Sequence, residues 1–461
     1  MVRASMIHLQ LLLLIPVRLP DAVILLIGGL CAFGAAWVLS WGVGAFSRRV
    51  GWLDYPAERR VHTIPVPRLG GVAIYLAFVV VSLLLYAPGP KSNANELAIY
   101  WLLVAAGGLM VLIHAYDDVF GLGPWPKLIA QTIAVIIILG PWDGVFHGIL
   151  LFTFNNPFGR QFAHPGLPWY MQPTLFLIIH TSAITWAAIP AVLLTWFWTV
   201  GMMNTVNWID GMDGLATGVV GITSLFITLI SFMLNQQSIA VLAAIFTGAI
   251  FGFLPWNWNP AKMFMGDSGA MFLGLGLAVL SVMGGAKLAL ALMVLGVPIL
   301  DVAIVIINRV RRGQSPLHYD KTHLHHRLMA TGLSVRQICY VLYGLSLLFG
   351  LLALSISGIH SAHFYKFIGV ALVGITMAAL VIWIDYRQRR RGGRIKLGGP
   401  YPENGNGSEH ENGNGNHFDE KGTGEVGHNG TSMNEYDAGI GETSNGQRDA
   451  HFSFRGSERE R

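Results

Sequence analysis

Carboxylate and amide side chains recur at short spacings in two polar segments of the chain. Asp117 and Asp118 are adjacent, and such a pair either binds Mg²⁺ or lets one carboxylate act as a base while the other binds the metal. The second segment places oxygen ligands at every third position: Asn204, Asn207, Asp210 and Asp213. These hard ligands suit Mg²⁺ better than zinc, and the ligand spacing of an EF-hand is absent. On its own the Asp-Asp pair is more often a solvated helix cap, so the second segment is the stronger indication of a site.

A third segment, Gly266-Asp267-Ser268-Gly269, opens a predicted helix. The unpaired N–H groups and the positive dipole end of a helix favour phosphate. A simple N-cap explains the same residues equally well.

Imidazole and cationic side chains lie in two further polar loops. The donors of one loop suit a diphosphate: His323, His325, His326 and Arg327. Zinc is less favoured there, because no cysteine or further ligand set lies nearby. The other loop precedes a predicted helix at 69–87, and its charges could hold an anionic headgroup: Arg60, His62 and Arg68.

Asp301 differs from the other acids because it falls inside an apolar run, three residues after Pro298. An acidic residue within a membrane helix is costly and usually functional, which would suit a proton relay. Pro298 frees part of the neighbouring backbone, so a buried hydrogen-bond role for the Asp301 carboxylate is the favoured interpretation.

Long apolar runs must position these polar segments. The chain has 461 residues, of which 53% are hydrophobic and 12% are charged, whereas a soluble domain carries about 25% charged residues. Cys31 and Cys339 lie in apolar runs and suggest neither a disulfide nor a metal cluster. We predict an all-α polytopic membrane protein with about eleven transmembrane helices: 21–46, 69–87, 97–115, 127–141, 188–203, 214–234, 238–255, 268–284, 287–308, 338–358 and 364–385.

Basic residues indicate which side of the membrane the polar loops face. The loops 47–68 and 309–337 are rich in arginine, and both fall on one side if each predicted helix crosses once. The positive-inside rule makes that side cytosolic. The segments with Asp117, Asp210 and Asp267 then face the same side. A surface enzyme needs acids at such helix ends, whereas an ion transporter needs them at mid-bilayer.

The remaining segments complete the domain organisation. We expect an interfacial segment at 1–20 and a transmembrane domain at 21–386. From 387–461 basic residues give way to a Gly-, Asn- and Glu-rich sequence without apolar periodicity, which predicts a disordered cytosolic tail. The stretch 148–160 suggests a small external β-hairpin. The stretch 174–200 fits one tilted helix or a half-span followed by a full span, and one crossing is favoured because two would separate the basic loops.

In order along the chain, these motifs resemble those of the polyprenyl-phosphate N-acetylhexosamine-1-phosphate transferases, of the glycosyltransferase 4 type. The resemblance covers residues 21–385. The His-x-His-His-Arg-Leu and Pro-x-Pro-Arg-x-Gly-Gly forms are most similar to the undecaprenyl-phosphate GlcNAc-1-phosphate transferase branch. The matching segments are His62 with Pro65-Val-Pro67-Arg68-Leu-Gly-Gly71, Asp117-Asp118, Asn204 to Ala216, Gly266-Asp267-Ser-Gly269, and His323 to Leu328.

This resemblance implies a reaction and a location. The protein would transfer N-acetylglucosamine 1-phosphate from a UDP-N-acetylhexosamine to undecaprenyl phosphate, with release of UMP, as the first membrane step of a cell-envelope glycan pathway such as lipopolysaccharide or teichoic acid biosynthesis. It would be a multi-pass protein of the bacterial plasma membrane with a cytosolic active site, no nucleic-acid partner and a homodimeric state. The alternatives are the phospho-MurNAc-pentapeptide transferase of peptidoglycan synthesis and, from other classes, a transporter or flippase, or an inactive scaffold.

The resemblance also implies roles for individual residues. Asn207 and Asp267 would hold Mg²⁺, for which Mn²⁺ could substitute. Asp117 and Asp118 would form the catalytic pair that serves the lipid phosphate or the metal. The residues expected to bind substrate are Arg60, His62, Arg68, Asn204, Asp210, Asp213, His323, His325, His326 and Arg327.

Two positions depart from the family pattern. Arg60 stands where lysine is common, and Ala270 stands where serine is common. Direct attack by the lipid phosphate, with Asp117 assisting its deprotonation, is the favoured mechanism. A covalent aspartyl-phosphate intermediate fits the same residues.

Overall fold

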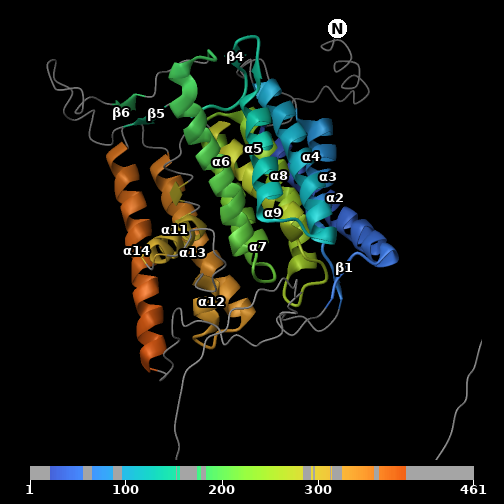
Figure 1. Cartoon of the computed structure of the whole chain (residues 1–461), viewed down its shortest axis with the longest axis vertical. Helices are drawn as coiled ribbons and strands as arrows, with labels where there is room; N and C mark the ends of the chain where they lie inside the picture. Colours follow the sequence, from blue (N-terminus) through green and yellow to red (C-terminus); the bar gives the residue numbers. More distant parts are fainter. Residues whose placement is uncertain are drawn as a thin grey trace, which may run out of the picture. The chain divides into compact units, whose positions relative to one another are not determined.

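The chain folds mainly into α-helices that run side by side (Figure 1). The computed structural model describes residues 21–55, 65–86, 96–151, 153–155, 174–177, 183–283, 292–293, 296–311, 313, 324–357 and 363–390. Its helices are α2 (Asp21–Val50), α3 (Gly70–Leu85), α4 (Glu96–Phe120), α5 (Pro124–Leu139), α6 (Ile189–Ile209), α7 (Leu215–Met233), α8 (Gln237–Asn257), α9 (Gly266–Met283), α11 (Gly296–Arg311), α12 (Leu324–Met329), α13 (Val335–Ser357) and α14 (His363–Arg390).

Each predicted apolar segment overlaps one of these helices, which confirms the all-α polytopic membrane fold. Among the described residues, 7 helices are long and apolar enough to cross a membrane: α2, α4, α6, α7, α8, α9 and α13. The helices α3 and α5 are apolar but have 16 residues each, just below the range of about 17–25 that spans a bilayer. The structure therefore confirms the fold class, and the number of crossings stays a prediction.

Several helices continue past the apolar runs that predicted them, and two of these extensions carry residues of the predicted site. The helix α4 runs to Phe120 instead of ending at 115, and α6 runs to Ile209 instead of 203. Hydropathy marks where side chains become polar, but backbone hydrogen bonding extends the helix beyond that point. Asp117, Asp118 and Asn207 consequently stand on the last turns of helices.

The helix α9 lies inside the bundle and packs on α3, α4, α6, α7 and α8. Its Phe272 ring lies 5.7 Å from the rings of both Phe78 and Phe246, between centroids. A Cβ added to Gly274 would meet Met203 Cα of α6 at 2.5 Å, so the two helices approach closely. Small residues permit such close packing in membrane proteins. The position of α9, whose first turn carries Asp267, is therefore set by five surrounding helices.

Short strands lie at both ends of the bundle. At one end β1 (Leu53–Asp54) pairs with β2 (Val66–Pro67) in antiparallel fashion, with Leu53 opposite Pro67. At the other end β3 (Pro141–Trp142) pairs with β4 (Val145–Phe146). Figure 1 shows β4, β5 and β6 at the end of the bundle opposite β1 and α12.

The predicted hairpin at 148–160 differs from the observed pairing. The strand β5 (Thr153–Asn155) pairs antiparallel with β6 (Thr174–Leu177), so its partner lies well outside the predicted segment. The helix α6 begins only at Ile189, after a short 3₁₀ turn at Trp186–Ala188. The helix predicted at 188–203 is therefore found as α6, whereas residues 174–177 of the stretch 174–200 form a strand, because a short apolar run does not distinguish strand from helix.

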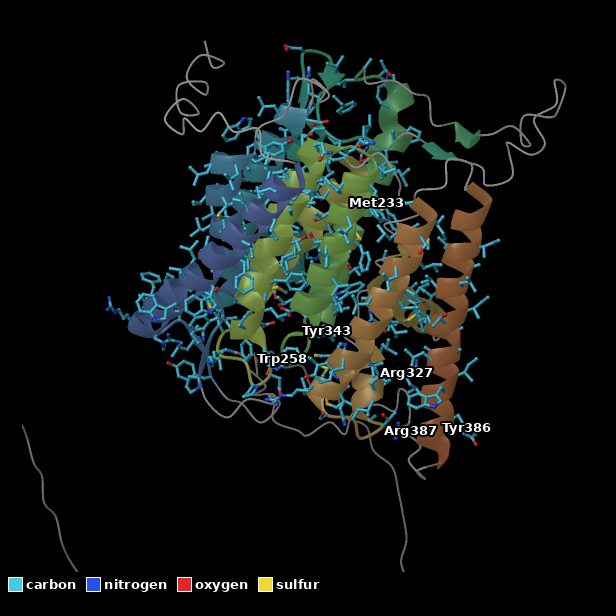
Figure 2. All side chains as sticks on the ribbon, turned by 180° about the vertical axis from the view of Figure 1, so that it is seen from behind. Met233, Trp258, Arg327, Tyr343, Tyr386 and Arg387 are labelled. Atoms are coloured by element: carbon cyan, nitrogen blue, oxygen red, sulfur yellow. The ribbon has the colours of Figure 1, made fainter. Side chains whose placement is uncertain are left out.

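The two ends of the bundle differ in their side chains. Figure 2 shows Trp258, Arg327 and Arg387 toward one end and Met233 toward the other. The guanidinium carbon of Arg387 lies 5.1 Å from the ring centroid of Trp383, and α14 extends to Arg390, beyond the predicted boundary at 386. The predicted interfacial segment 1–20 and the tail from 391 lie outside the described residues.

Candidate active site

Two glycine-containing segments meet at the centre of the site. The N–H groups of Gly70 and Gly71, at the start of α3, donate to the carbonyl oxygens of Phe264 and Met265 at 3.0 and 2.9 Å. A Cβ added to Gly71 would lie 2.1 Å from the backbone nitrogen of Gly269. The starts of α3 and α9 are thus in backbone contact, which explains why both motifs need glycine at these positions.

A third glycine brings Arg68 and Asp118 to the same point. Gly266 has a φ of +73°, a conformation that side chains rarely adopt. A Cβ added there would meet the Arg68 carbonyl oxygen at 2.3 Å and Asp118 Oδ2 at 2.4 Å. The close approach fixes the position of Asp267, the next residue, against both neighbours.

Asp118 closes the start of α9. Its Oδ1 accepts a hydrogen bond from the Asp267 N–H at 2.8 Å, and its Oδ2 accepts bonds from the Ser268 N–H at 3.1 Å and the Ser268 hydroxyl at 2.8 Å. The side chain is 0% exposed, and Arg68 Nε lies 3.4 Å from Oδ1. A carboxylate at a helix N-terminus satisfies free N–H groups and opposes the helix dipole. These contacts give Asp118 a positioning role, and its catalytic role stays a prediction.

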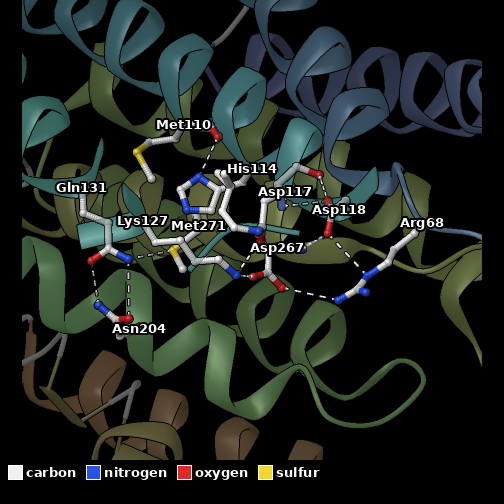
Figure 3. Close-up of polar contacts among 12 residues, drawn as sticks. Arg68, Met110, His114, Asp117, Asp118, Lys127, Gln131, Asn204, Asp267 and Met271 are labelled. Atoms are coloured by element: carbon white, nitrogen blue, oxygen red, sulfur yellow. Dashed lines mark hydrogen bonds and ion pairs between the residues drawn. The ribbon is translucent and has the colours of Figure 1, made fainter. Parts of the chain in front are cut away.

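Asp117 and Asp267 share one ammonium group, that of Lys127 on α5. Lys127 Nζ lies 2.5 Å from Asp117 Oδ2 and 2.7 Å from Asp267 Oδ2. The other oxygen of Asp267 lies 3.6 Å from a guanidinium nitrogen of Arg68, and Asp117 Oδ1 accepts the Leu122 N–H at 2.6 Å. Figure 3 shows the three carboxylates between the two cations. The three acids thus come from two helices far apart in the sequence, as predicted.

Lys127 and His114 belong to the site but were not predicted from the sequence. Lys127 is the single charged residue in α5, and a lone cation at the start of an apolar helix was the signal that could have identified it. His114 is fully buried one turn before Asp117, and its Nδ1 lies 2.9 Å from the carbonyl oxygen of Met110. That carbonyl can only accept, so Nδ1 carries the proton.

The loop between α6 and α7 contains Asp210 and Asp213, which have different environments. Burial and the nearby carboxylate of Asp267 raise the pKa of Asp210 well above its usual range. Asp213 Oδ2 accepts hydrogen bonds from Asn259 Nδ2 at 2.9 Å and from the Ala261 N–H at 3.1 Å. Asp213 therefore joins this loop to the one that leads into α9, while Asp210 lies close enough to Asp267 for the two charges to interact.

Asn204 and Asn207 stand one turn apart on α6. The Asn204 amide donates to Gln131 Oε1 of α5 at 2.9 Å and to the Val200 carbonyl oxygen at 2.8 Å (Figure 3). Asn207 is partly exposed on the last turn, and among the described residues no hydrogen bond joins its side chain to Asp267. The predicted roles of Asn204 in substrate binding and of Asn207 in metal binding stay predictions.

The histidine segment forms the short helix α12 and packs on the same loop. His325 is 3% exposed, and a Cβ added to Gly211 would lie 2.6 Å from His325 Nε2. The rings of His325 and His326 lie 4.3 Å apart, and His326 and Arg327 are partly exposed. The structure therefore brings His325 to the segment between Asp210 and Asp213. The predicted site residues Arg60, His62 and His323 lie outside the described residues.

The oxygen-rich donor set can be compared with the needs of Mg²⁺. The described residues hold no group of three or more His, Cys, Asp or Glu side chains arranged around a metal. Mg²⁺ usually takes one or two carboxylates and completes its shell with waters and substrate phosphate. Asp267 and Asp117 offer such carboxylates, on either side of the point that Lys127 Nζ occupies. The residues present therefore fit Mg²⁺ bound together with a substrate diphosphate.

Comparisons with known proteins agree with this geometry. The model of glycosyl transferase family 4 matches residues 100–285. The chain is 32% identical over 314 residues to a Bacillus subtilis protein named probable undecaprenyl-phosphate N-acetylglucosaminyl 1-phosphate transferase, covering 66% of this chain and 77% of that protein. It is 32% identical over 338 residues to the decaprenyl-phosphate N-acetylglucosaminephosphotransferase of Mycolicibacterium smegmatis, covering 68% and 75%. It is also 30% identical over 301 residues to a Staphylococcus aureus phospho-N-acetylmuramoyl-pentapeptide-transferase, covering 64% and 85%.

Proposed function

Because the chain belongs to glycosyl transferase family 4, we propose that it transfers N-acetylglucosamine 1-phosphate from UDP-N-acetylglucosamine to a polyprenyl phosphate and releases UMP. The observation that carries this proposal is the cluster of Asp117, Asp267, Lys127 and Arg68 at one end of a bundle of membrane helices. Such a site is within reach of both a lipid phosphate and a soluble nucleotide sugar. The names of the first two relatives described above both include a polyprenyl phosphate and N-acetylglucosamine.

The reaction joins two anions, so the site must offset their repulsion. An oxygen of the lipid phosphate attacks the sugar-bound phosphorus of the donor, a new diphosphate bond forms, and the bond to the UMP phosphate breaks. Lys127 and Arg68 are 24% and 37% exposed, so both cations can reach incoming phosphate oxygens. Preorganised cations stabilise the charge that builds on a transferring phosphoryl group.

The acids have separate tasks in this proposal. Asp117, held by Lys127 and by the Leu122 N–H, takes the proton from the lipid phosphate when that phosphate arrives protonated. Asp118 keeps the start of α9 in place and so orients Asp267. Asp267 and Asn207 would hold Mg²⁺, with Asp117 across Lys127 Nζ as a further carboxylate, and the ion when bound supplies positive charge to the donor diphosphate. The residues of α12 would contact the diphosphate or the sugar.

The choice between direct attack and a covalent intermediate can be tested by trapping. We propose direct attack by the lipid phosphate, with Asp117 acting as its base and not as a nucleophile toward the donor. Protein incubated with UDP-N-acetylglucosamine and Mg²⁺, without lipid, should show no added phosphate by intact-mass spectrometry. A phosphorylated protein would contradict direct attack.

A second donor deserves a parallel test, because the Staphylococcus aureus relative is named for a pentapeptide-bearing muramoyl group. Purified protein would be given undecaprenyl phosphate and Mg²⁺ with UDP-N-acetylglucosamine, UDP-N-acetylgalactosamine or UDP-MurNAc-pentapeptide. We expect lipid-dependent UMP release with UDP-N-acetylglucosamine and at most slow release with the other two. Release with UDP-MurNAc-pentapeptide alone would replace our proposal with the peptidoglycan reaction.

We further propose that the site faces the cytosol of a bacterial plasma membrane and that the protein forms a homodimer. Arg68 and Arg327, which belong to the two arginine-rich loops, lie at the end of the bundle that holds the site, which supports the orientation through the positive-inside rule. A cysteine at position 387 in a variant without Cys31 and Cys339 should react with a membrane-impermeant maleimide only after cells are opened. Reaction in intact cells would show that the site faces the opposite side of the membrane.

The proposed homodimer is tested by light scattering of the purified protein, which gives the number of chains in the particle.

A further inference from the structure

Asp301 is a buried acid that the proposed reaction does not use. It lies within α11 and is 6% exposed. Its Oδ1 accepts a hydrogen bond from the Leu324 N–H at 2.7 Å. Leu324 is the first residue of α12, the short helix that carries His325, His326 and Arg327. The acid on a long helix is therefore bonded to the start of the segment that faces the site.

The contact continues from α12 to the aspartate-containing loop. Asp301, Leu324 and His325 line one small pocket together with Ile209 and Leu215, the residues that end α6 and begin α7. His325 packs on Gly211, where an added Cβ would come within 2.6 Å of its ring. Asp301 thus stands at one end of a continuous set of contacts that ends between Asp210 and Asp213.

A buried carboxylate destabilises a membrane helix unless its oxygens receive hydrogen bonds. An acceptor at the start of a helix satisfies an N–H group that has no partner within that helix. The helix α12 has only 6 residues, too few to be stable on its own. Its position must therefore come from outside contacts, and the bond to Asp301 is one that fixes its first residue.

We propose that Asp301 is a positioning residue that holds α12 against the α6–α7 loop and thereby sets where His325, His326 and Arg327 stand relative to Asp210. This proposal extends to catalysis only if the proposed function holds, but the placement of α12 does not depend on it. Asp301 acts through α12 and does not need to touch substrate.

Two substitutions distinguish the hydrogen-bond acceptor of Asp301 from its negative charge. Asp301→Leu keeps a similar shape in an apolar setting and removes the acceptor, whereas Asp301→Asn keeps an oxygen that can accept the Leu324 N–H. We expect Asp301→Leu to lower kcat/KM for UDP-N-acetylglucosamine by about 10- to 100-fold, the range for residues that orient a site. The kcat/KM of Asp301→Asn should stay within about threefold of the wild-type value, since the amide oxygen can accept the hydrogen bond from the Leu324 N–H in place of the carboxylate. An inactive Asp301→Asn would favour a proton relay and overturn the proposal.

Ser346 provides a matched control, because it is a buried polar residue of α13 whose hydroxyl, among the described residues, donates only to the Leu342 carbonyl oxygen of its own helix, at 2.9 Å. Ser346→Ala should leave kcat/KM unchanged. The losses caused by Asp301→Leu and His325→Ala should combine to less than their product, since both act through α12. Fully multiplicative losses would contradict the proposal.

Hydrogen exchange tests the placement of α12 without turnover. The amides of Leu324–Met329 should exchange faster in Asp301→Leu than in the wild type, in Asp301→Asn or in Ser346→Ala, while those of α9 stay unchanged. Unchanged exchange of α12 in Asp301→Leu would overturn the proposal. If Asp301→Leu does not fold, the proposal is tested by the activity of Asp301→Asn and by the hydrogen exchange of α12 in that variant. A wild type without UMP release but with this exchange pattern would refute only the proposed function.

Discussion

At the residue scale, Asp267 has the most connected position in the site. One of its oxygens faces Lys127, the other faces Arg68, and its N–H is bonded to Asp118. The sequence motif Gly-Asp-Ser-Gly predicted that Asp267 begins a helix, and the structure confirms it. The motif could not show that the partners of Asp267 are Arg68, Asp118 and Lys127, because such contacts arise only when helices distant in the sequence pack together.

Asp267→Asn tests the metal assignment at this residue. Loss of one negative charge should weaken Mg²⁺ binding and reduce UMP release by at least about 100-fold, as for other groups that stabilise transferring charge. The measurement is kcat/KM over a Mg²⁺ titration. Asp143→Asn, an exposed residue in the turn at the other end of the bundle, is the matched control and should match the wild type. Full Mg²⁺-dependent activity in Asp267→Asn would refute the assignment.

Asp118→Asn tests whether this residue acts by capping α9. The amide would turn a donor toward N–H groups that need an acceptor, so we expect a loss of about 1–3 kcal/mol in stability. The apparent Tm should fall by a few degrees, while Asp143→Asn leaves it unchanged. A normal Tm with abolished activity would instead favour a direct catalytic role for Asp118.

Lys127→Ala tests the shared ammonium. Without the cation between Asp117 and Asp267, the two carboxylates should bind Mn²⁺ more tightly, although turnover falls because a phosphate-binding cation is lost. Electron paramagnetic resonance of bound Mn²⁺ gives the affinity, and UMP release gives the turnover. Lys262→Ala, at an exposed position, should change neither. An unaltered Mn²⁺ affinity in Lys127→Ala would show that the lysine does not occupy a cation position.

At the element scale, the site depends on how closely helices approach one another. The starts of α3 and α9 are joined by two backbone hydrogen bonds, and no side chain fits between Gly71 and Gly269. The two glycine motifs, nearly 200 residues apart in the sequence, are therefore halves of one contact. The sequence showed each motif but not that they meet.

Gly71→Ala tests this contact. The added Cβ would lie 2.1 Å from a backbone nitrogen, so we expect destabilisation of about 1–3 kcal/mol or more from overpacking, together with loss of activity. Thermal unfolding followed by fluorescence provides the measurement. Gly201→Ala is the matched control, because a Cβ there meets nothing within 4 Å. Equal Tm values for the two variants would contradict the close approach.

Helix ends and short strands were predicted less well than helices. Apolar runs predicted each long helix, but α4 and α6 extend beyond them and carry the polar site residues within the helix. The apolar run at 174–177 is a strand, because pairing with Thr153–Asn155 determines its conformation. Hydropathy has no access to such pairing.

At the scale of the whole molecule, the sequence predicted that the acids gather at one end of a polytopic membrane protein. Apolar runs and arginine-rich loops were sufficient for this prediction, since every helix that crosses the membrane moves the chain to the other side and so determines which loops share a side. The structure brings Asp117, Asp118, Asp210 and Asp267 into one cluster. The contribution of Lys127 and the capping role of Asp118 could be identified only from the packed structure, because the chemistry of a residue type does not show which groups it is paired with.

The measurement that most directly tests the account is the mass of the lipid product. Purified protein would be incubated with undecaprenyl phosphate, UDP-N-acetylglucosamine and Mg²⁺, and the lipid and nucleotide products would be identified by mass spectrometry. We predict a lipid that has gained one N-acetylglucosamine and one phosphate, in equal amount to released UMP. A lipid that gained the sugar with release of UDP, or an unchanged lipid, would contradict the account.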